Sequence, residues 1–258
     1  MTFLPMVQRE LRVLSRKPAT YRWRWIIGGI AFGLALLLVM MMGLVGRPQG
    51  WGLALFHTLT VYAAMVCVMA GLFGTADIIS EERREGTLGL LFLTDLKGYD
   101  VVIGKFSAVA LNAFYWLLAI LPVLSLPLLL GGVTFGEFIR VSLALVNLLF
   151  FAMALGTWAS ARVMEVVHSL SVATGILVLF GGLVPALFFG LMNPGGGDEA
   201  WAALTFSPIL TLFWVGSTKY GASPQLYWYP LLSSQLLAWA FLAFTSWRLP
   251  QIWHQPVR

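Results

Sequence analysis

The chain has 258 residues, of which 59% are hydrophobic and only 10% are charged. An ordinary soluble domain carries about 25% charged residues, so this composition excludes a globular surface covered by water. The apolar residues occur in uncharged blocks that are long enough to cross a bilayer, which takes about 20 residues of helix. These blocks are residues 25–45, 51–76, 106–136, 141–161, 166–197 and 220–247. We therefore expect an all-α polytopic membrane protein with six transmembrane helices.

The net charge of +5 is explained by membrane topology, and it does not call for nucleic acid as a partner. Basic residues that flank spans accumulate on the cytoplasmic side. If the N-terminus lies inside, all sixteen Lys and Arg residues are cytoplasmic except Arg47, Arg140 and Lys219. We expect both termini in the cytoplasm and the protein in the cell (inner) membrane.

Residues 1–20 predict a basic amphipathic helix that lies in the headgroup plane of the inner leaflet. Apolar residues recur there at helical spacing, and arginines fall on another face of the helix. The apolar set is Phe3, Val7, Leu11 and Leu14, and the basic set is Arg9, Arg12 and Arg16. Pro18 ends this pattern, because proline disfavours helical geometry in the residue before it. The first span is expected to begin near Tyr21, among interfacial aromatic and arginine anchors.

Two regions interrupt the simple pattern of spans. Pro122 and Pro127 are expected to kink the third span or to end it early. Residues 193–230 hold a polar turn, an apolar stretch at 200–217 and an interruption at Ser207-Pro208. The stretch at 200–217 could be a seventh span, but its shortness favours an external or re-entrant pair of short helices.

Side chains that could carry catalysis or bind a metal ion are few. Residues 98–106 resemble a phosphate-binding loop, but the glycine spacing is wrong and Phe106 replaces the required hydroxyl residue. Cys67 is the only cysteine, and the three histidines fall in distant parts of the chain. We expect no catalytic site, no metal site and no bound cofactor.

Three polar side chains lie within or near the predicted spans, where polar groups are costly and often functional. Asp77, near the inner end of the second span, is interpreted as a carboxylate that reaches the interface, with a proton relay as the alternative. Asn112 and Asn147 lie well inside spans. We interpret them as hydrogen-bonding between helices, with the lining of a substrate pathway as the alternative.

Residues 80–105 form the main charged loop, with a polar start and an apolar middle. Thr87 suits the N-cap of a short helix on which Leu88, Leu91 and Phe92 share one face. Such a face either fills a groove on a partner protein or lies on the inner leaflet.

This loop resembles the one that follows the second span in permease subunits of ABC-2 type transporters, which reads E-[KR]-x-x-G-T-L-E-L-L-L-x-T-P and then I-V-L-G-K. Gly89 stands where glutamate is usual, and Asp95 stands where proline is usual. The N-terminal helix is similar to the family's elbow helix, and residues 204–208 are similar to its L-x-x-S-P element. The matching loop residues are Glu82, Arg83, Gly86, Thr87, Leu88, Leu90, Leu91, Thr94, Val102, Gly104 and Lys105.

The resemblance implies a single transmembrane domain over residues 1–258 that moves a substrate, with export the commoner direction, when a separate cytoplasmic ABC ATPase binds ATP. The chain would then be no enzyme by itself, and it would pair with a second copy or with a related permease. The implied ATPase-coupling residues are Glu82, Arg83, Gly86, Thr87, Leu88, Leu91 and Phe92. The alternative is a membrane scaffold or assembly factor that recruits a cytoplasmic partner without transport.

Overall fold

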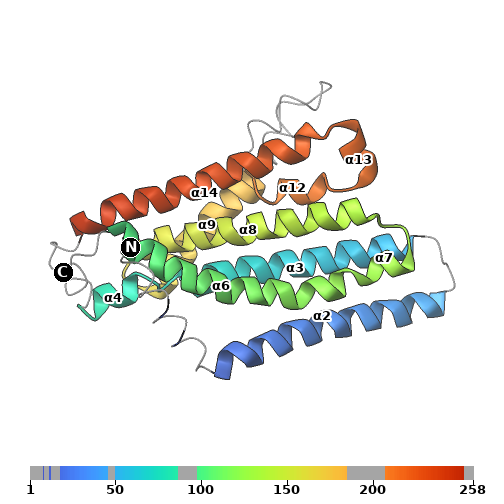
Figure 1. Ribbon diagram of the computed structural model, residues 1–258, viewed down its shortest axis with the longest axis horizontal. Helices are drawn as coiled ribbons and strands as arrows, with labels where there is room; N and C mark the ends of the chain where they lie inside the picture. Colours follow the sequence, from blue (N-terminus) through green and yellow to red (C-terminus); the bar gives the residue numbers. More distant parts are fainter. Residues whose placement is uncertain are drawn as a thin grey trace.

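The computed structural model describes Gln8, Arg12 and residues 18–45, 50–86, 98–184 and 207–252. Every regular element in these ranges is a helix, and the long helices run side by side (Figure 1). The long elements are α2 (Pro18–Val45), α3 (Trp51–Thr75), α6 (Gly98–Leu124), α8 (Phe135–Arg162), α9 (Val166–Val178) with the π-helix η1 (Leu179–Leu183), and α14 (Gln225–Ile252). The short helices are α4 (Ser80–Arg84), α7 (Leu126–Leu130), α12 (Leu210–Phe213) and α13 (Ser217–Ala222).

Five stretches of helix are long and apolar enough to cross a membrane, and they coincide with the first five expected spans. They are Tyr21–Met41, Trp51–Arg84, Gly98–Leu130, Phe135–Arg162 and Val166–Leu183. The sixth expected span corresponds to α14, which has 28 residues but is less hydrophobic than the five candidate spans. Its sequence is rich in Trp, Tyr, Ser and Gln, which are less apolar than the residues of the other spans. The all-helical fold is thus confirmed, with five candidate spans.

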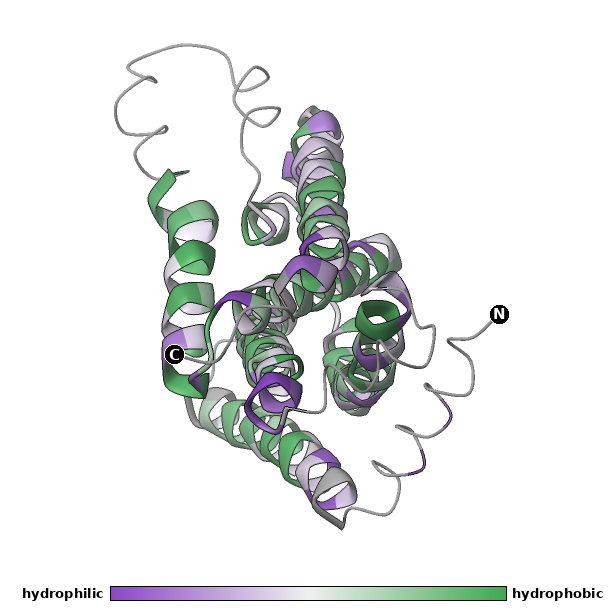
Figure 2. Ribbon diagram, turned by 90° about the vertical axis from the view of Figure 1, so that its left-hand side faces the viewer, coloured by the Kyte–Doolittle hydropathy of each residue, from purple (hydrophilic) through white to green (hydrophobic). Residues whose placement is uncertain are grey.

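Large apolar side chains cover much of the outside of the bundle. Trp25 is 83% exposed, Leu236 71% and Met65 64%, and Figure 2 shows that apolar residues make up most of the long helices. A water-soluble monomer rarely exposes so much contiguous apolar surface, whereas lipid covers such a surface readily.

Helix α8 lies at the centre of the bundle. In its apolar window 61% of the residues are buried, against 17% in α2, and it contacts α3, α6, α9 and α14. Small residues let α3 approach it closely: a Cβ atom on Gly71 would lie 2.6 Å from the Cβ of Ala152, and one on Gly156 would clash with the Thr75 hydroxyl. Small residues at such crossings are typical of helix packing in membranes.

Several boundaries differ from the sequence expectation. The first candidate span begins at Tyr21 as expected, but helix α2 already starts at Pro18, because a helix tolerates proline in its first turn, where the missing N–H group would be unpaired anyway. The expected loop at 80–105 is shorter than predicted, since α4 takes up its start and residues 98–105 already belong to α6. The break predicted from Pro122 and Pro127 is confirmed, with α6 ending at Leu124 and α7 starting at Leu126.

Two of the expected regions fall mainly outside the described residues. Of the amphipathic helix at 1–20, only Gln8, Arg12 and the start of α2 are described. Of the region at 193–230, residues 193–206 are outside the description, and the remainder holds α12, α13 and the start of α14. Neither α12 nor α13 is long enough to cross a membrane. Helix α14 begins at Gln225, within the stretch expected to be irregular, so that stretch ends earlier than predicted.

The end of the bundle opposite α4 is held together by Glu137, near the start of α8. The Thr134 amide donates to Glu137 Oε2 at 2.7 Å, and the Glu137 amide donates to Thr134 Oγ1 at 3.2 Å. The second carboxylate oxygen accepts the Ser217 amide at 2.5 Å, and Arg140 Nε donates to the Val215 carbonyl at 3.0 Å. The α12–α13 segment is therefore fixed to α8.

Candidate functional site

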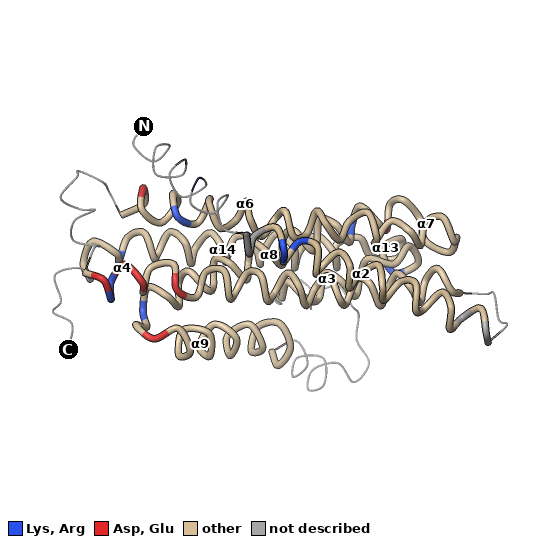
Figure 3. The backbone as a smooth tube through the Cα atoms, turned by 90° about the horizontal axis from the view of Figure 1, so that it is seen from below, with Lys and Arg blue, Asp and Glu red and all other residues tan. Residues whose placement is uncertain are grey.

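The described part of the expected coupling site lies at the corner between α3 and α4, where charged residues gather at one end of the bundle (Figure 3). The chain leaves α3 at Thr75 and enters α4 at Ser80. Gly86 then adopts a φ of +69°, in the left-handed region that glycine occupies without strain. Glu82, Arg83 and Gly86 are described, and the other expected residues, Thr87, Leu88, Leu91 and Phe92, lie outside the described residues.

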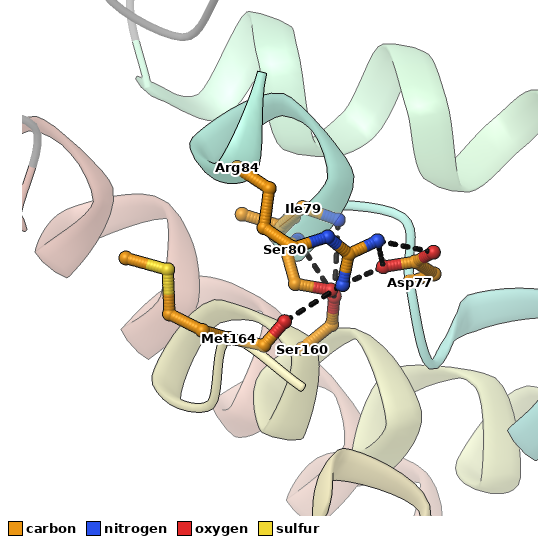
Figure 4. Close-up of polar contacts among 6 residues, drawn as sticks. All are labelled: Asp77, Ile79, Ser80, Arg84, Ser160 and Met164. Atoms are coloured by element: carbon orange, nitrogen blue, oxygen red, sulfur yellow. Dashed lines mark hydrogen bonds and ion pairs between the residues drawn. The ribbon is translucent and has the colours of Figure 1, made fainter. Parts of the chain in front are cut away.

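Ser160 of α8 anchors the start of α4 (Figure 4). Its hydroxyl oxygen accepts hydrogen bonds from the amides of Ile79 at 3.0 Å and Ser80 at 3.1 Å. The Ser80 hydroxyl in turn donates to Asp77 Oδ1 at 2.6 Å. The first amides of a helix have no partner within the helix and need one from outside it. Here a neighbouring helix supplies that partner, in a position from which water is excluded, since Ser80 and Ser160 are buried.

Two arginines of α4 bind backbone carbonyls near the end of α8. Arg83 Nη1 donates to the Ala161 carbonyl at 3.0 Å, and Arg84 Nη1 donates to the Met164 carbonyl at 2.7 Å. Arg84 Nη2 also bonds both carboxylate oxygens of Asp77, each at 2.7 Å (Figure 4). Basic side chains commonly satisfy the last carbonyls of a helix in this way. Helix α4 is thus held against the end of α8 at both of its ends.

An ion pair joins α4 to α6. Lys105 Nζ lies 2.6 Å from Glu82 Oε1, and the two side chains are only 10% and 21% exposed. The start of α6 also packs closely on α14, because a Cβ on Gly98 would lie 2.6 Å from the Ser246 carbonyl oxygen. Both ends of the connection over residues 87–97 are therefore fixed to the helical bundle.

These contacts join α4 to both α8 and α6. A displacement of residues 87–97 would act on α4 and α6, and through them on α3 and α8. Among the described residues, no cluster of His, Cys, Asp or Glu could hold a metal ion.

The other predicted polar residues occupy different environments. Asp77 pairs with Arg84, and its side chain is 36% exposed. Asn147 is buried in α8, and its Nδ2 donates to Ser234 Oγ of α14 at 2.7 Å. Asn112 Oδ1 is buried without a hydrogen-bond partner among the described residues. Among the described residues, no hydrogen bond joins Asp77, Asn112 and Asn147 to one another.

The sequence reasoning missed Ser160 and Arg84 as members of this site. Arg84 had a weak signal, because it stands seven positions after a carboxylate at the end of a span. Ser160 had none, because a serine among the small residues 159–161 is ordinary in a packed transmembrane helix. Lys105 was among the residues that match the ABC-2 loop motif, but the neighbouring sequence gave no sign that Glu82, 23 residues earlier, is its partner.

A groove with a volume of about 870 Å³ runs along α3, between that helix and the α9 and α12 regions. Most of its lining residues are apolar, and a few are polar. The apolar ones include Val61, Met65, Met69, Leu148, Leu177 and Leu212, and the polar ones include His57, Ser217 and Lys219.

The model of a family described as ABC-2 family transporter protein matches residues 54–202, which is more than half of the chain. The matched range holds the α3–α4 corner, α6, α8 and α9. A search of the curated proteins gives no match.

Proposed function

Since the chain belongs to the ABC-2 family of transporter proteins, we propose that it moves its substrate when a separate cytoplasmic ABC ATPase binds ATP. Members of this family are membrane permeases of ABC transporters and are not themselves catalytic. The source of energy must then lie on another chain. A second copy of this permease, or a related one, completes the transporter.

The topology proposed for this permease has six spans, with α14 as the sixth and residues 1–20 as the elbow helix. Helix α14 has 28 residues, or about 42 Å at a rise of 1.5 Å per residue, which exceeds the thickness of a bilayer core. It also packs against α8 and α6. The distribution of Lys and Arg supports cytoplasmic termini in the inner membrane, and it places the α4 end of the bundle inside. Residues 1–258 then form one transmembrane domain.

The observation that carries the proposal is the attachment of α4 to α8 and α6. Ser160, Arg83 and the Lys105–Glu82 pair leave α4 little freedom to move on its own. Thr87, Leu88, Leu91 and Phe92 are proposed to enter a groove on the ATPase, while Glu82, Arg83 and Gly86 shape the base of the loop. Closure of two ATPases would move this base and shift the helices of the paired permeases between two arrangements.

The groove along α3 supports a substrate with apolar surface. Most of its lining residues are apolar, and its polar residues include Ser217, whose amide binds Glu137 at the end opposite α4. In the proposed topology this end lies on the outer side, so a hydrophobic or amphipathic molecule could leave there. Export is the direction proposed.

The test replaces Leu91 and Phe92 with glutamate and asks whether an ATPase still co-purifies. The full chain is purified in mild detergent, and the bound proteins are identified by mass spectrometry. We expect the L91E/F92E variant to insert normally and to lose its ATPase. The matched control is Phe135→Glu, which changes an exposed aromatic residue at the opposite end.

Two outcomes would count against this function. Retention of the ATPase by the double variant would remove the proposed role of the loop. A partner that co-purifies with the unchanged protein but binds no nucleotide would favour the scaffold alternative.

A further inference from the structure

Two arginines from different helices flank the same aromatic ring. Arg162, in the last turn of α8, places its Cζ atom 5.3 Å from the ring centroid of Phe244 in α14. Arg248, also in α14, places its Cζ atom 5.4 Å from the same centroid. The two guanidinium carbons are therefore at most about 11 Å apart. Arg162 also lies over the ring of Trp158 at 4.4 Å.

Neither guanidinium forms a hydrogen bond or an ion pair with any part of the chain that the structure describes, and both side chains are exposed. Other basic residues at this end are engaged, since Arg83 binds a carbonyl and Arg84 and Lys105 bind carboxylates. A guanidinium carries five N–H donors and a permanent charge. Two such groups near one ring, with no carboxylate bound to either among the described residues, leave a positively charged site that suits an anion.

Exposed aromatic and apolar residues lie close to both arginines in the sequence. Trp247 is 63% exposed beside Arg248, and its ring lies 6.1 Å from that of Phe244. Val167, at the start of α9 and close in sequence to Arg162, is 70% exposed. Tryptophan next to arginine is typical of the level of lipid headgroups. These residues lie at the α4 end of the bundle, which the proposed topology places at the inner leaflet, where anionic lipids are concentrated.

We propose that Arg162 and Arg248 form a binding site for the phosphate group of an anionic phospholipid. The planar guanidinium fork matches phosphate oxygens in a bidentate manner, which a lysine ammonium cannot do. Phe244 holds both guanidinium groups near each other through cation–π contacts. The lipid tails lie against the apolar surface that includes Trp247 and Val167. A zwitterionic lipid binds less well, because its own ammonium group already neutralises its phosphate and the net attraction to the arginines is small.

The experiment measures lipid retention by the purified full chain, without any ATPase, so its outcome is independent of the proposed transport function. The protein is placed in nanodiscs or detergent with phosphatidylglycerol or phosphatidylcholine, and bound lipids are counted by native mass spectrometry. We expect R162Q and R248Q each to weaken phosphatidylglycerol binding by about fivefold, and the double variant by about 25-fold. Phosphatidylcholine binding stays unchanged.

The control is Arg22→Gln, which removes an exposed arginine near the start of α2 and should leave phosphatidylglycerol binding within twofold of the unchanged protein. If the glutamine variants do not insert, R162K and R248K keep the charge and remove the fork, and they should still weaken binding. Unchanged lipid binding in the double variant would overturn the proposal, as would an equal loss in R22Q. Thermal stabilisation by inorganic phosphate that equals that by phosphatidylglycerol would also overturn it, in favour of a free anion.

Discussion

Lys105 and Glu82 form an ion pair, with 2.6 Å between Lys105 Nζ and Glu82 Oε1. The pair joins α6 to α4, two helices that are separated in the chain by residues 85–97. Both side chains are shielded from water over most of their surface. Such pairs are screened less than surface pairs, and the loss of one partner leaves a charge without compensation.

Glu82→Gln should therefore lower the free energy of unfolding by about 1–3 kcal/mol, between the values for exposed and fully buried pairs. Lys105→Met combined with Glu82→Leu should be less damaging than either single change, because it leaves no unpaired charge. Thermal unfolding in detergent of Lys105→Met, Glu82→Leu and the double variant gives the coupling between the two residues. If the changes in the free energy of unfolding are additive, the ion pair between Lys105 and Glu82 does not contribute to stability.

Ser160→Ala should destabilise the α3–α4 corner, because the buried amides of Ile79 and Ser80 lose their acceptor. The expected cost is about 1–3 kcal/mol, typical of a buried group left without a partner. The control is Ser171→Ala, where an exposed hydroxyl bonds only a carbonyl of its own helix. Equal melting temperatures for the two variants would contradict the anchoring role of Ser160.

Gly71→Ala should destabilise the bundle, while Gly29→Ala should be neutral or slightly stabilising. A methyl group at Gly71 would meet Ala152 at 2.6 Å, whereas nothing lies within 4 Å of one at Gly29. Overpacking of this kind costs about 1–3 kcal/mol. The measurement is the melting temperature of each alanine variant. Both positions lie in helices, so a lower melting temperature for Gly71→Ala than for Gly29→Ala reflects the difference in packing.

Asn147 and Ser234 should show a small favourable coupling, since hydrogen bonds between membrane helices average about 0.6 kcal/mol in such cycles. The variants are Asn147→Ala, Ser234→Ala and the double variant, each measured by reversible unfolding. A zero coupling would mean that the contact between Asn147 Nδ2 and Ser234 Oγ is incidental.

Cysteine labelling tests the proposed orientation. Cys67 is buried, so the unchanged protein should give little background with a membrane-impermeant maleimide. Gly89→Cys should react only in inverted vesicles, and Gln49→Cys should react in intact cells. Reaction of Gly89→Cys from outside would reverse the topology and remove the basis for an ATPase contact at the loop.

The sequence predicted the helical spans well, because each depends on local composition. Runs without charge marked five spans, and Pro122 and Pro127 marked the break between α6 and α7. Helix α14 is less apolar, since its Tyr, Trp, Ser and Gln residues suit interfaces and interhelix contacts. Its status as a span therefore rests on length and packing.

The site was harder to predict, because its contacts join residues far apart in the chain. Ser160 meets Ile79 and Ser80 only because α3 and α8 pack side by side, and Lys105 meets Glu82 across the connection between α4 and α6. A single sequence carries no signal for such pairs. Asn147 was predicted as an interhelix residue, and the structure supplied Ser234 as its partner.

The close approach at Gly71 and Gly156 packs α3 tightly against α8. Away from this crossing, the described chain departs from regular α-helix at the interruption at Ser125 between α6 and α7 and at the wide turn of η1 that follows α9. If the bundle changes shape, we expect it to bend at these two places before the crossing of α3 and α8 opens.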